Sequence, residues 1–353
     1  MYESAGVRSD ERSVQLDLAR SVATITVVMI HLNDRIFDPI APMATHEQWV
    51  LHAVLNAIGR LAVPIFFMMS GSLVIPRADG THILRFYLKR IPQFVLLLIV
   101  YSLATNYVAF RMGYDASFEP RAILSDLLVG HMRDAFHLWF IPALIGVYLA
   151  APFINAMLRA NASTLVWYCT LAALLTMLPY TAGAIFTDRP WPIGLAQFFG
   201  SYLAYFVAGH LIMNAKMTSR VPTLPLMLTA GAAMIGAICV QHHVSPPGQP
   251  FRHMVTDYSS LFTAIPSVCA FIVLMRVQVR MPWLRIAIEN FSRLSFGVYL
   301  IHLAILHFVL RTLERNWPAD YRLLLPSLVL IVMTGWAYSF CLSKAGVLRK
   351  LVL

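Results

Sequence analysis

The chain has 353 residues and a mass of 39.6 kDa; 59% of its residues are hydrophobic, 12% are charged, and its mean hydropathy is +0.68. Soluble domains have roughly 45–50% apolar and about 25% charged residues, so this composition excludes a water-soluble fold, a disordered chain, a coiled coil and collagen. The 27 Lys and Arg residues exceed the 17 Asp and Glu residues by 10. The Lys and Arg residues lie mainly in short loops between apolar runs, which is typical of topology signals rather than of nucleic-acid binding.

The remaining class is an all-α polytopic membrane protein. A membrane-spanning helix needs about 20 apolar residues, and runs of about this length predict ten spans with no soluble domain. The predicted spans are residues 14–33, 51–75, 91–110, 137–155, 164–181, 194–213, 223–240, 258–276, 291–311 and 322–342.

The basic residues of the connecting loops predict an orientation. Fifteen Lys and Arg residues lie on the side of the N-terminus and eight on the other side. Because cytoplasmic loops carry the excess of positive charge, both termini are expected inside. We therefore expect one transmembrane domain over residues 14–342, with residues 1–13 and 343–353 as short cytoplasmic tails.

The four cysteines lie inside apolar runs, and their spacing is not that of metal ligands, so the sequence predicts neither disulfides nor a metal site. They are Cys169, Cys239, Cys269 and Cys341.

The first span carries polar residues on one stripe. At 100° per residue, Asp17, Arg20, Thr24 and His31 fall within about 60° of one another, with His31 about 21 Å further along the helix than Asp17. A charged side chain within a span costs at least about 2.5–3.5 kcal/mol near the bilayer centre, so the stripe is expected to face other helices or a wet cavity. Two interpretations remain: an Asp–Arg pair that holds the bundle together beside an interfacial histidine, or a catalytic or proton-handling stripe.

The second span also carries polar groups. Asn56 and Arg60 share a face with Ser70, and Pro64 leaves the carbonyl of Arg60 without its helical partner. Arg60 either pairs with an acid elsewhere in the bundle or lines a cavity. Ser70 is followed by Gly71, where backbone or ligand can approach closely.

The loop after this span is the most basic part of the chain. It holds Arg77, Arg85, Lys89 and Arg90. Such a cluster either contacts anionic lipid or binds a phosphorylated ligand, because Arg and Lys suit phosphate oxygens.

Two later spans carry further candidates. His137 is expected at the same depth as His31, and Trp139 beside it suits either an aromatic belt or a binding site. Ser295, Tyr299 and His302 lie within about 60° of one another on their span. His302 is either a buried histidine satisfied by a carbonyl or part of a site.

Five motifs in this order resemble the integral-membrane acyltransferase 3 family, nearest to the branch that O-acetylates enterobacterial common antigen. The resemblance runs from about residue 14 to residue 340. The matching segments are Leu16–Ser21 with Val27–His31, Arg60–Gly71, Phe86–Arg90, His137–Phe140 with Ala143–Leu149, and Ser295–His302.

The resemblance implies an O-acyltransferase in a bacterial inner membrane. Such enzymes take an acyl group, usually acetyl from cytoplasmic acetyl-CoA, and deliver it to a hydroxyl of a glycan or lipid-linked saccharide. His31 matches the essential histidine of the family, and Lys89 and Arg90 match a basic motif associated with the donor. Many members have a second arginine where this chain has Gln93.

Acyl transfer to a hydroxyl needs a base and a group that stabilises an oxyanion. His31 is predicted to be the general base or a covalent acyl relay, and the residues leave both open. Arg60 is the candidate for stabilising negative charge, while Asp17 and Arg20 are expected to fix the first span and contact the donor.

The other candidates are assigned to binding. Ser70, Gly71, Lys89 and Arg90 are predicted to bind the donor, and His137, Trp139, Tyr299 and His302 the acceptor. The expected partners are acyl-CoA, a saccharide and the lipid bilayer, without nucleic acid or metal. The alternatives are a transporter or flippase, which usually shows two matching halves that this sequence lacks, and a non-catalytic assembly subunit.

Overall fold

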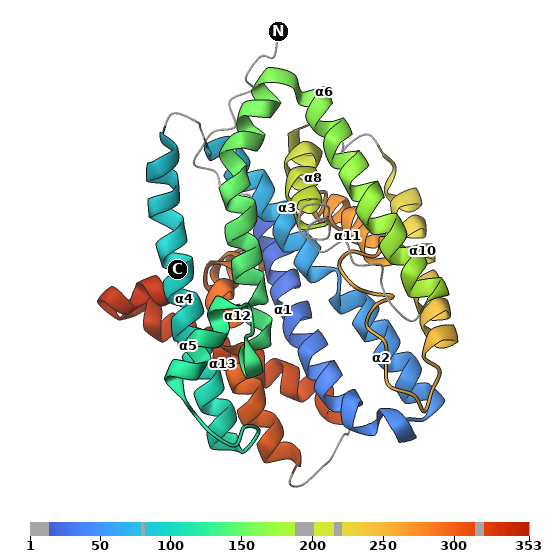
Figure 1. The fold of residues 1–353 in the computed structure, drawn as a ribbon, viewed down its shortest axis with the longest axis vertical. Helices are drawn as coiled ribbons and strands as arrows, with labels where there is room; N and C mark the ends of the chain where they lie inside the picture. The colour runs from blue at the N-terminus through green and yellow to red at the C-terminus, as the bar shows by residue number, and fades with distance from the viewer. Residues whose placement is uncertain (1–13, 79–81, 188–200, 215–220, 315–320, 353) are drawn as a thin grey trace.

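The structure is a computed structural model that describes residues 14–78, 82–187, 201–214, 221–314 and 321–352. These residues form a bundle of helices, and no strand occurs among them (Figure 1). The predicted tail 1–13 and the first part of the predicted span 194–213 lie outside the described residues.

Eleven α-helices and five 3₁₀ segments position the site. The α-helices are α1 (Val14–Phe37), α2 (His46–Gly59), α3 (Ala62–Val74), α4 (Ile83–Met112), α5 (Pro120–Leu128), α6 (Phe140–Phe186), α8 (Leu203–Asn214), α10 (Thr223–Val244), α11 (Leu261–Leu274), α12 (Pro282–Glu314) and α13 (Leu324–Lys344). The 3₁₀ segments are η1 (Asp38–Met43), η2 (Ile75–Arg77), η4 (Arg133–Trp139), η6 (Tyr321–Leu323) and η7 (Gly346–Leu351).

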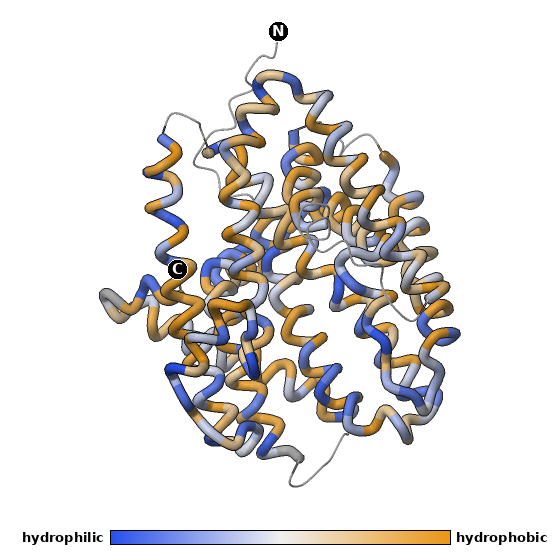
Figure 2. The backbone as a smooth tube through the Cα atoms, in the orientation of Figure 1, coloured by the Kyte–Doolittle hydropathy of each residue, from blue (hydrophilic) through white to orange (hydrophobic). Residues whose placement is uncertain are grey.

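The helices have the length and composition of membrane spans. Within the described residues, eight segments are long and apolar enough to cross a bilayer, and α8 and α11 are shorter apolar helices. Apolar residues predominate along the long helices (Figure 2), and many of them, such as Leu228, Ile235, Leu330 and Met333, are exposed on the outside of the bundle. Side chains of this kind need a lipid environment, so the prediction of an all-α polytopic membrane protein is confirmed; the count of ten spans stays a prediction.

The predicted span 51–75 lies within the apolar segment His46–Arg77, which is long enough to cross a bilayer and is broken into two helices. α2 ends at Gly59 and α3 begins at Ala62. Pro64 has no N–H to donate to the carbonyl of Arg60, and the regular ladder resumes where the N–H of Ile65 donates to the carbonyl of Leu61 at 3.2 Å. The break places Arg60 at a helix junction inside the bundle.

The predicted spans 137–155 and 164–181 fall in two apolar segments that are each long enough to cross a bilayer, and a sharp kink at Asn161 separates them within α6. The side-chain oxygen of Asn161 accepts a hydrogen bond from the backbone N–H of Thr164 at 3.1 Å, which caps the second half like the start of a new helix. Before the first of these spans, Pro120 begins the short helix α5.

The centre of the bundle is built on α1 and α12, which pack along each other, and on α3, which packs along α8. Gly71 of α3 and Gly209 of α8 permit the second contact. A Cβ atom at Gly71 would lie 1.6 Å from the carbonyl oxygen of Phe206, and one at Gly209 would lie 1.9 Å from that of Met68. These glycines let the two backbones touch.

Candidate active site

The polar stripe of α1 faces α12. Asp17 is 3% exposed and accepts a hydrogen bond of 2.6 Å from the hydroxyl of Ser292. Four turns further along α1, the ring of His31 lies against that of His302. The stripe is therefore directed into the bundle, and its inner end links two central helices through a buried, charge-assisted hydrogen bond.

Replacing Ser292 with alanine should lower the free energy of unfolding by about 1–3 kcal/mol, because the carboxylate of Asp17 loses a buried donor. The rate of the folded enzyme should change little, since Ser292 lies nearly three turns of α12 from His302, the member of the imidazole cluster, described next, that is on the same helix. Thermal unfolding of the purified variant checks the first expectation, and its specific activity per folded molecule checks the second. Unchanged stability would contradict a structural role for this contact.

Three imidazoles gather where α1, α12 and η4 meet. The ring centroids of His31 and His302 are 5.4 Å apart in a stacked arrangement, and those of His302 and His137 are 4.8 Å apart. Phe136 covers another side of His31 at 5.3 Å. His137 and His302 are buried, whereas His31 is partly exposed. We call His31, His137 and His302 the imidazole cluster; His31 is the member that a ligand can reach.

Backbone carbonyls fix the tautomers of the two buried rings. The Nδ1–H of His302 donates to the carbonyl of Tyr299 at 2.5 Å, and the Nε2–H of His137 donates to the carbonyl of Leu300 at 3.2 Å. The opposite nitrogens, Nε2 of His302 and Nδ1 of His137, have no hydrogen-bond partner among the described residues. His31 makes no hydrogen bond with any described residue. The cluster therefore holds unused lone pairs inside the bundle, which is unusual for buried polar atoms.

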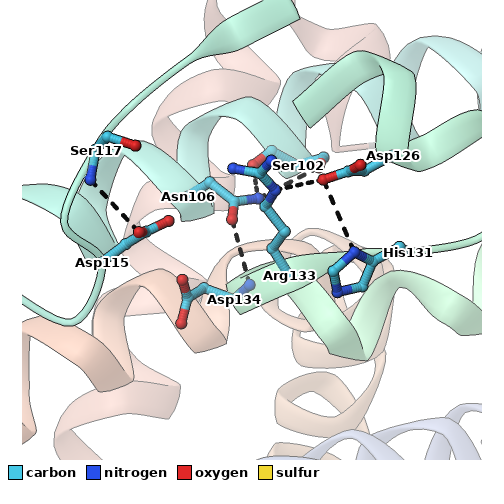
Figure 3. Close-up of polar contacts among 8 residues, drawn as sticks. All are labelled: Ser102, Asn106, Asp115, Ser117, Asp126, His131, Arg133 and Asp134. Atoms are coloured by element: carbon cyan, nitrogen blue, oxygen red, sulfur yellow. Dashed lines mark hydrogen bonds and ion pairs between the residues drawn. The ribbon is translucent and has the colours of Figure 1, made fainter. Parts of the chain in front are cut away.

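The segment that carries His137 is held from the opposite side by a polar network (Figure 3). The Nε of Arg133 donates to the carboxylate of Asp126 at 2.5 Å. The backbone N–H of Asp134 donates to the side-chain oxygen of Asn106 at 3.2 Å, and Asn106 is itself bonded to the carbonyl of Ser102. This network ties η4 to α4 and α5 and so sets the depth at which His137 enters the bundle.

Arg60 lies at the junction of α2 and α3 beside aromatic rings. Its guanidinium carbon is 5.3 Å from the ring centroid of Tyr258, and that ring lies 5.4 Å from Trp139. Arg60 makes no ion pair with a carboxylate in the described part of the chain, and its buried Nε has no partner there. The carboxylate of Asp34 attracts the guanidinium of Arg60 electrostatically from beyond ion-pair distance. Trp139 is thus part of the interior rather than of an outer aromatic belt.

A second polar group surrounds Asn56, one turn before Arg60. The side-chain amide of Asn56 donates to Asp34 at 3.3 Å and to Nδ1 of His253 at 3.4 Å, and its oxygen accepts from Thr256 at 2.7 Å. Burial, together with the nearby Arg60, lowers the pKa of His253 to about 4, so this ring is uncharged at neutral pH. The loop after α10 therefore joins the site through neutral hydrogen bonds.

At the other end of the bundle, Tyr148 connects the remaining candidates. Its hydroxyl lies beside the side chain of Ser70, and both Arg90 and Arg20 lie near enough to interact with it electrostatically. Lys89 is exposed on α4 beside Arg90. We call Arg20, Ser70, Arg90 and Tyr148 the tyrosine cluster. Gly71 is accounted for by the contact with α8 and needs no ligand to explain it.

Seven of the twelve predicted site residues fall into two groups. His31, His137 and His302 form the imidazole cluster, and Tyr299 supports it by donating from its hydroxyl to the carbonyl of His137 at 2.5 Å. Arg20, Ser70 and Arg90 meet around Tyr148. Sequence reasoning did not assign Tyr148, Tyr258 and Ser292, which are connected to the site by contacts between distant spans. Tyr148 lies in the motif of residues 143–149, and Ser295, Phe296 and Gly297 begin the motif that ends at His302. The residues that these motifs contact could not be deduced from the sequence.

This architecture is that of a multi-pass membrane protein. Its interior holds the partly exposed His31, the guanidinium of Arg60 and, separately, the tyrosine cluster. The family model described as "Acyltransferase domain", that of the acyltransferase 3 family, matches residues 13–344. The chain belongs to this family and is a membrane acyltransferase. No match was found among curated proteins or among solved structures.

Proposed function

We propose that the protein transfers an acyl group, acetyl in the simplest case, from acyl-CoA to a hydroxyl of a cell-surface glycan or lipid-linked saccharide in a bacterial inner membrane. The observation that carries the proposal is His31, a partly exposed imidazole without hydrogen bonds in the described part of the chain, held against His302 inside the bundle. Family membership supplies acyl transfer, and the imidazole supplies its base.

In this mechanism His31 takes the proton of the acceptor hydroxyl while the hydroxyl oxygen forms a bond to the thioester carbonyl carbon. The carbonyl oxygen becomes an oxyanion, which Arg60 stabilises because a buried guanidinium without an ion pair has charge to offer. The C–S bond then breaks, the ester remains on the acceptor, and CoA leaves as a thiol after taking the proton from His31.

A two-step variant uses the same residues. The imidazole nitrogen of His31 attacks the thioester first, CoA leaves, and the acyl-imidazole then passes its acyl group to the hydroxyl. The separation of the two clusters favours this variant, because the tyrosine cluster lies at the predicted inner end of α1 and His31 lies about 16 Å further along the helix than Arg20. Arg20, Ser70, Lys89 and Arg90 are the residues proposed for the donor, and His137, Trp139, Tyr299 and His302 for the acceptor side.

The acceptor class is proposed from the resemblance to the branch that acetylates enterobacterial common antigen and from the polar lining of the outer half. Asp34 and His253 are partly exposed polar groups, and Trp139 and Tyr258 offer flat rings. Such a combination suits a polyhydroxylated ligand.

The function is tested with the purified protein in liposomes, acetyl-CoA labelled in the acetyl group, and a lipid-linked saccharide. The expected result is label in the saccharide together with an equal amount of free CoA thiol. Intact acetyl-CoA with movement of the saccharide across the membrane would contradict the proposal and favour transport.

A further inference from the structure

The last residues of the chain, expected to form a short tail, are folded against the bundle. After α13, the chain reverses at Gly346, whose φ of +51° lies in the left-handed region that favours glycine. Residues 346–351 then form η7, and Val352 is completely buried. Figure 1 shows this end of the chain beside α4.

Two helices, α4 and α12, anchor the segment. The hydroxyl of Tyr101 in α4 donates to the carbonyl of Leu351 at 2.9 Å, and the side-chain amide of Gln93 donates to the carbonyl of Lys350 at 3.4 Å. In α12, Gly297 leaves room for Val352, since a Cβ atom there would lie 3.0 Å from that of Val352. The position of η7 is therefore set by buried and hydrogen-bonded contacts.

This position brings two more cations to the basic part of α4. Gln93 lies one helical turn from Lys89 and Arg90, on the same face, and it holds the backbone that carries Arg349 and Lys350. All four cationic side chains are exposed. Residues 83–112, which form α4, contain no Asp or Glu. Residues 339–353, which include η7, contain none either. Four like charges on adjacent segments repel one another, so a bound anion would stabilise the arrangement.

A hollow in the surface lies next to these cations. It is open to the outside and has a volume of about 780 Å³, and its lining, which includes Arg85, Lys89, Leu84 and Leu88, comes entirely from residues 82–89 at the start of α4. Cations beside an apolar wall suit a ligand that has both phosphate groups and a flat ring.

We propose that Arg349 and Lys350 of the C-terminal segment complete, with Lys89 and Arg90, a two-segment site for the phosphate groups of acyl-CoA. The inference rests on the proposed function and adds to it the residues that recognise the donor. CoA carries a diphosphate and a separate 3′-phosphate. Cations on two segments can contact both, whereas one helix face offers only a single short row of cations. Arg contacts phosphate through a bidentate fork and Lys as a point charge.

The main test compares wild type with the double variant Arg349→Gln/Lys350→Gln. Both residues are exposed, so the variant should fold. Loss of the phosphate contacts should raise the KM for acetyl-CoA about tenfold, with kcat at saturation unchanged within about twofold. The increase should be smaller with 3′-dephospho-acetyl-CoA, which lacks one of the phosphates. The matched control is Arg280→Gln, which removes an exposed cation from the connection between α11 and α12 and should leave KM unchanged.

A binding measurement separates CoA from lipid phosphate, which the same cations could contact. Calorimetric titration with CoA is made in nanodiscs of phosphatidylcholine alone and of phosphatidylcholine with phosphatidylglycerol. The inference predicts that the double variant binds CoA about tenfold more weakly in both. A double variant that binds CoA with wild-type affinity would overturn the inference. This holds even if the affinity of the variant responds to phosphatidylglycerol differently from that of wild type. Absence of CoA binding by wild type would overturn the proposed function as well.

Discussion

Replacing His31 with alanine should reduce the rate of acyl transfer by about a thousandfold or more, because the reaction loses its base or its acyl carrier. The rate is measured as release of CoA thiol by the purified protein. Folding should be unaffected, since His31 is partly exposed and makes no hydrogen bond to the described residues that would be left unsatisfied. The variant should therefore insert into membranes and unfold at nearly the wild-type temperature.

The control for this experiment is His243→Ala. His243 is an exposed histidine at the end of α10, outside the imidazole cluster, and its loss should leave the rate unchanged. A His31→Ala enzyme with the rate of wild type would remove the mechanism, even if the protein proved to be an acyltransferase.

Replacing Gly71 with valine should prevent the bundle from assembling. A Cβ atom at this position would lie 1.6 Å from a backbone oxygen of α8, a distance that neither rotamer change nor side-chain motion can relieve. The two helices would have to separate, at a cost of more than about 3 kcal/mol. Size-exclusion chromatography of the detergent-solubilised variant should show little folded protein.

Gly231→Val is the matched control, because a Cβ atom at Gly231 in α10 meets nothing within 4 Å. It should elute as wild type does. A Gly71→Val variant that is folded and stable would show that α3 and α8 are not in backbone contact, and it would return Gly71 to the candidates for the donor channel.

Local patterns predicted the features that depend on one helix. The periodicity of α1 placed Asp17 and His31 on one stripe, and the structure directs both toward α12. Pro64 indicated an irregularity near Arg60, because the loss of its N–H is a local effect. The sequence could not show that the helix ends there and restarts, since that outcome depends on what packs around Arg60.

Features that depend on distant spans were not predictable. Ser70 meets Tyr148, and Gln93 meets Lys350, across separations that no periodicity encodes. Gly71 was assigned to the donor because glycine permits close approach, but pattern alone cannot distinguish approach by a ligand from approach by another helix. The C-terminal segment was assigned as a tail because the few residues after the last span carry no apolar run, although Val352 is buried and Tyr101 and Gln93 bind the backbone just before it.

The central claim is that acyl transfer to the acceptor requires the imidazole of His31 on α1. Mass spectrometry of the saccharide after incubation with acetyl-CoA and proteoliposomes tests it most directly, with wild type and His31→Ala prepared side by side and matched for CoA binding. We expect an added acetyl ester on the saccharide with wild type and none with the variant. The same ester formed at the same rate by both proteins would contradict the claim.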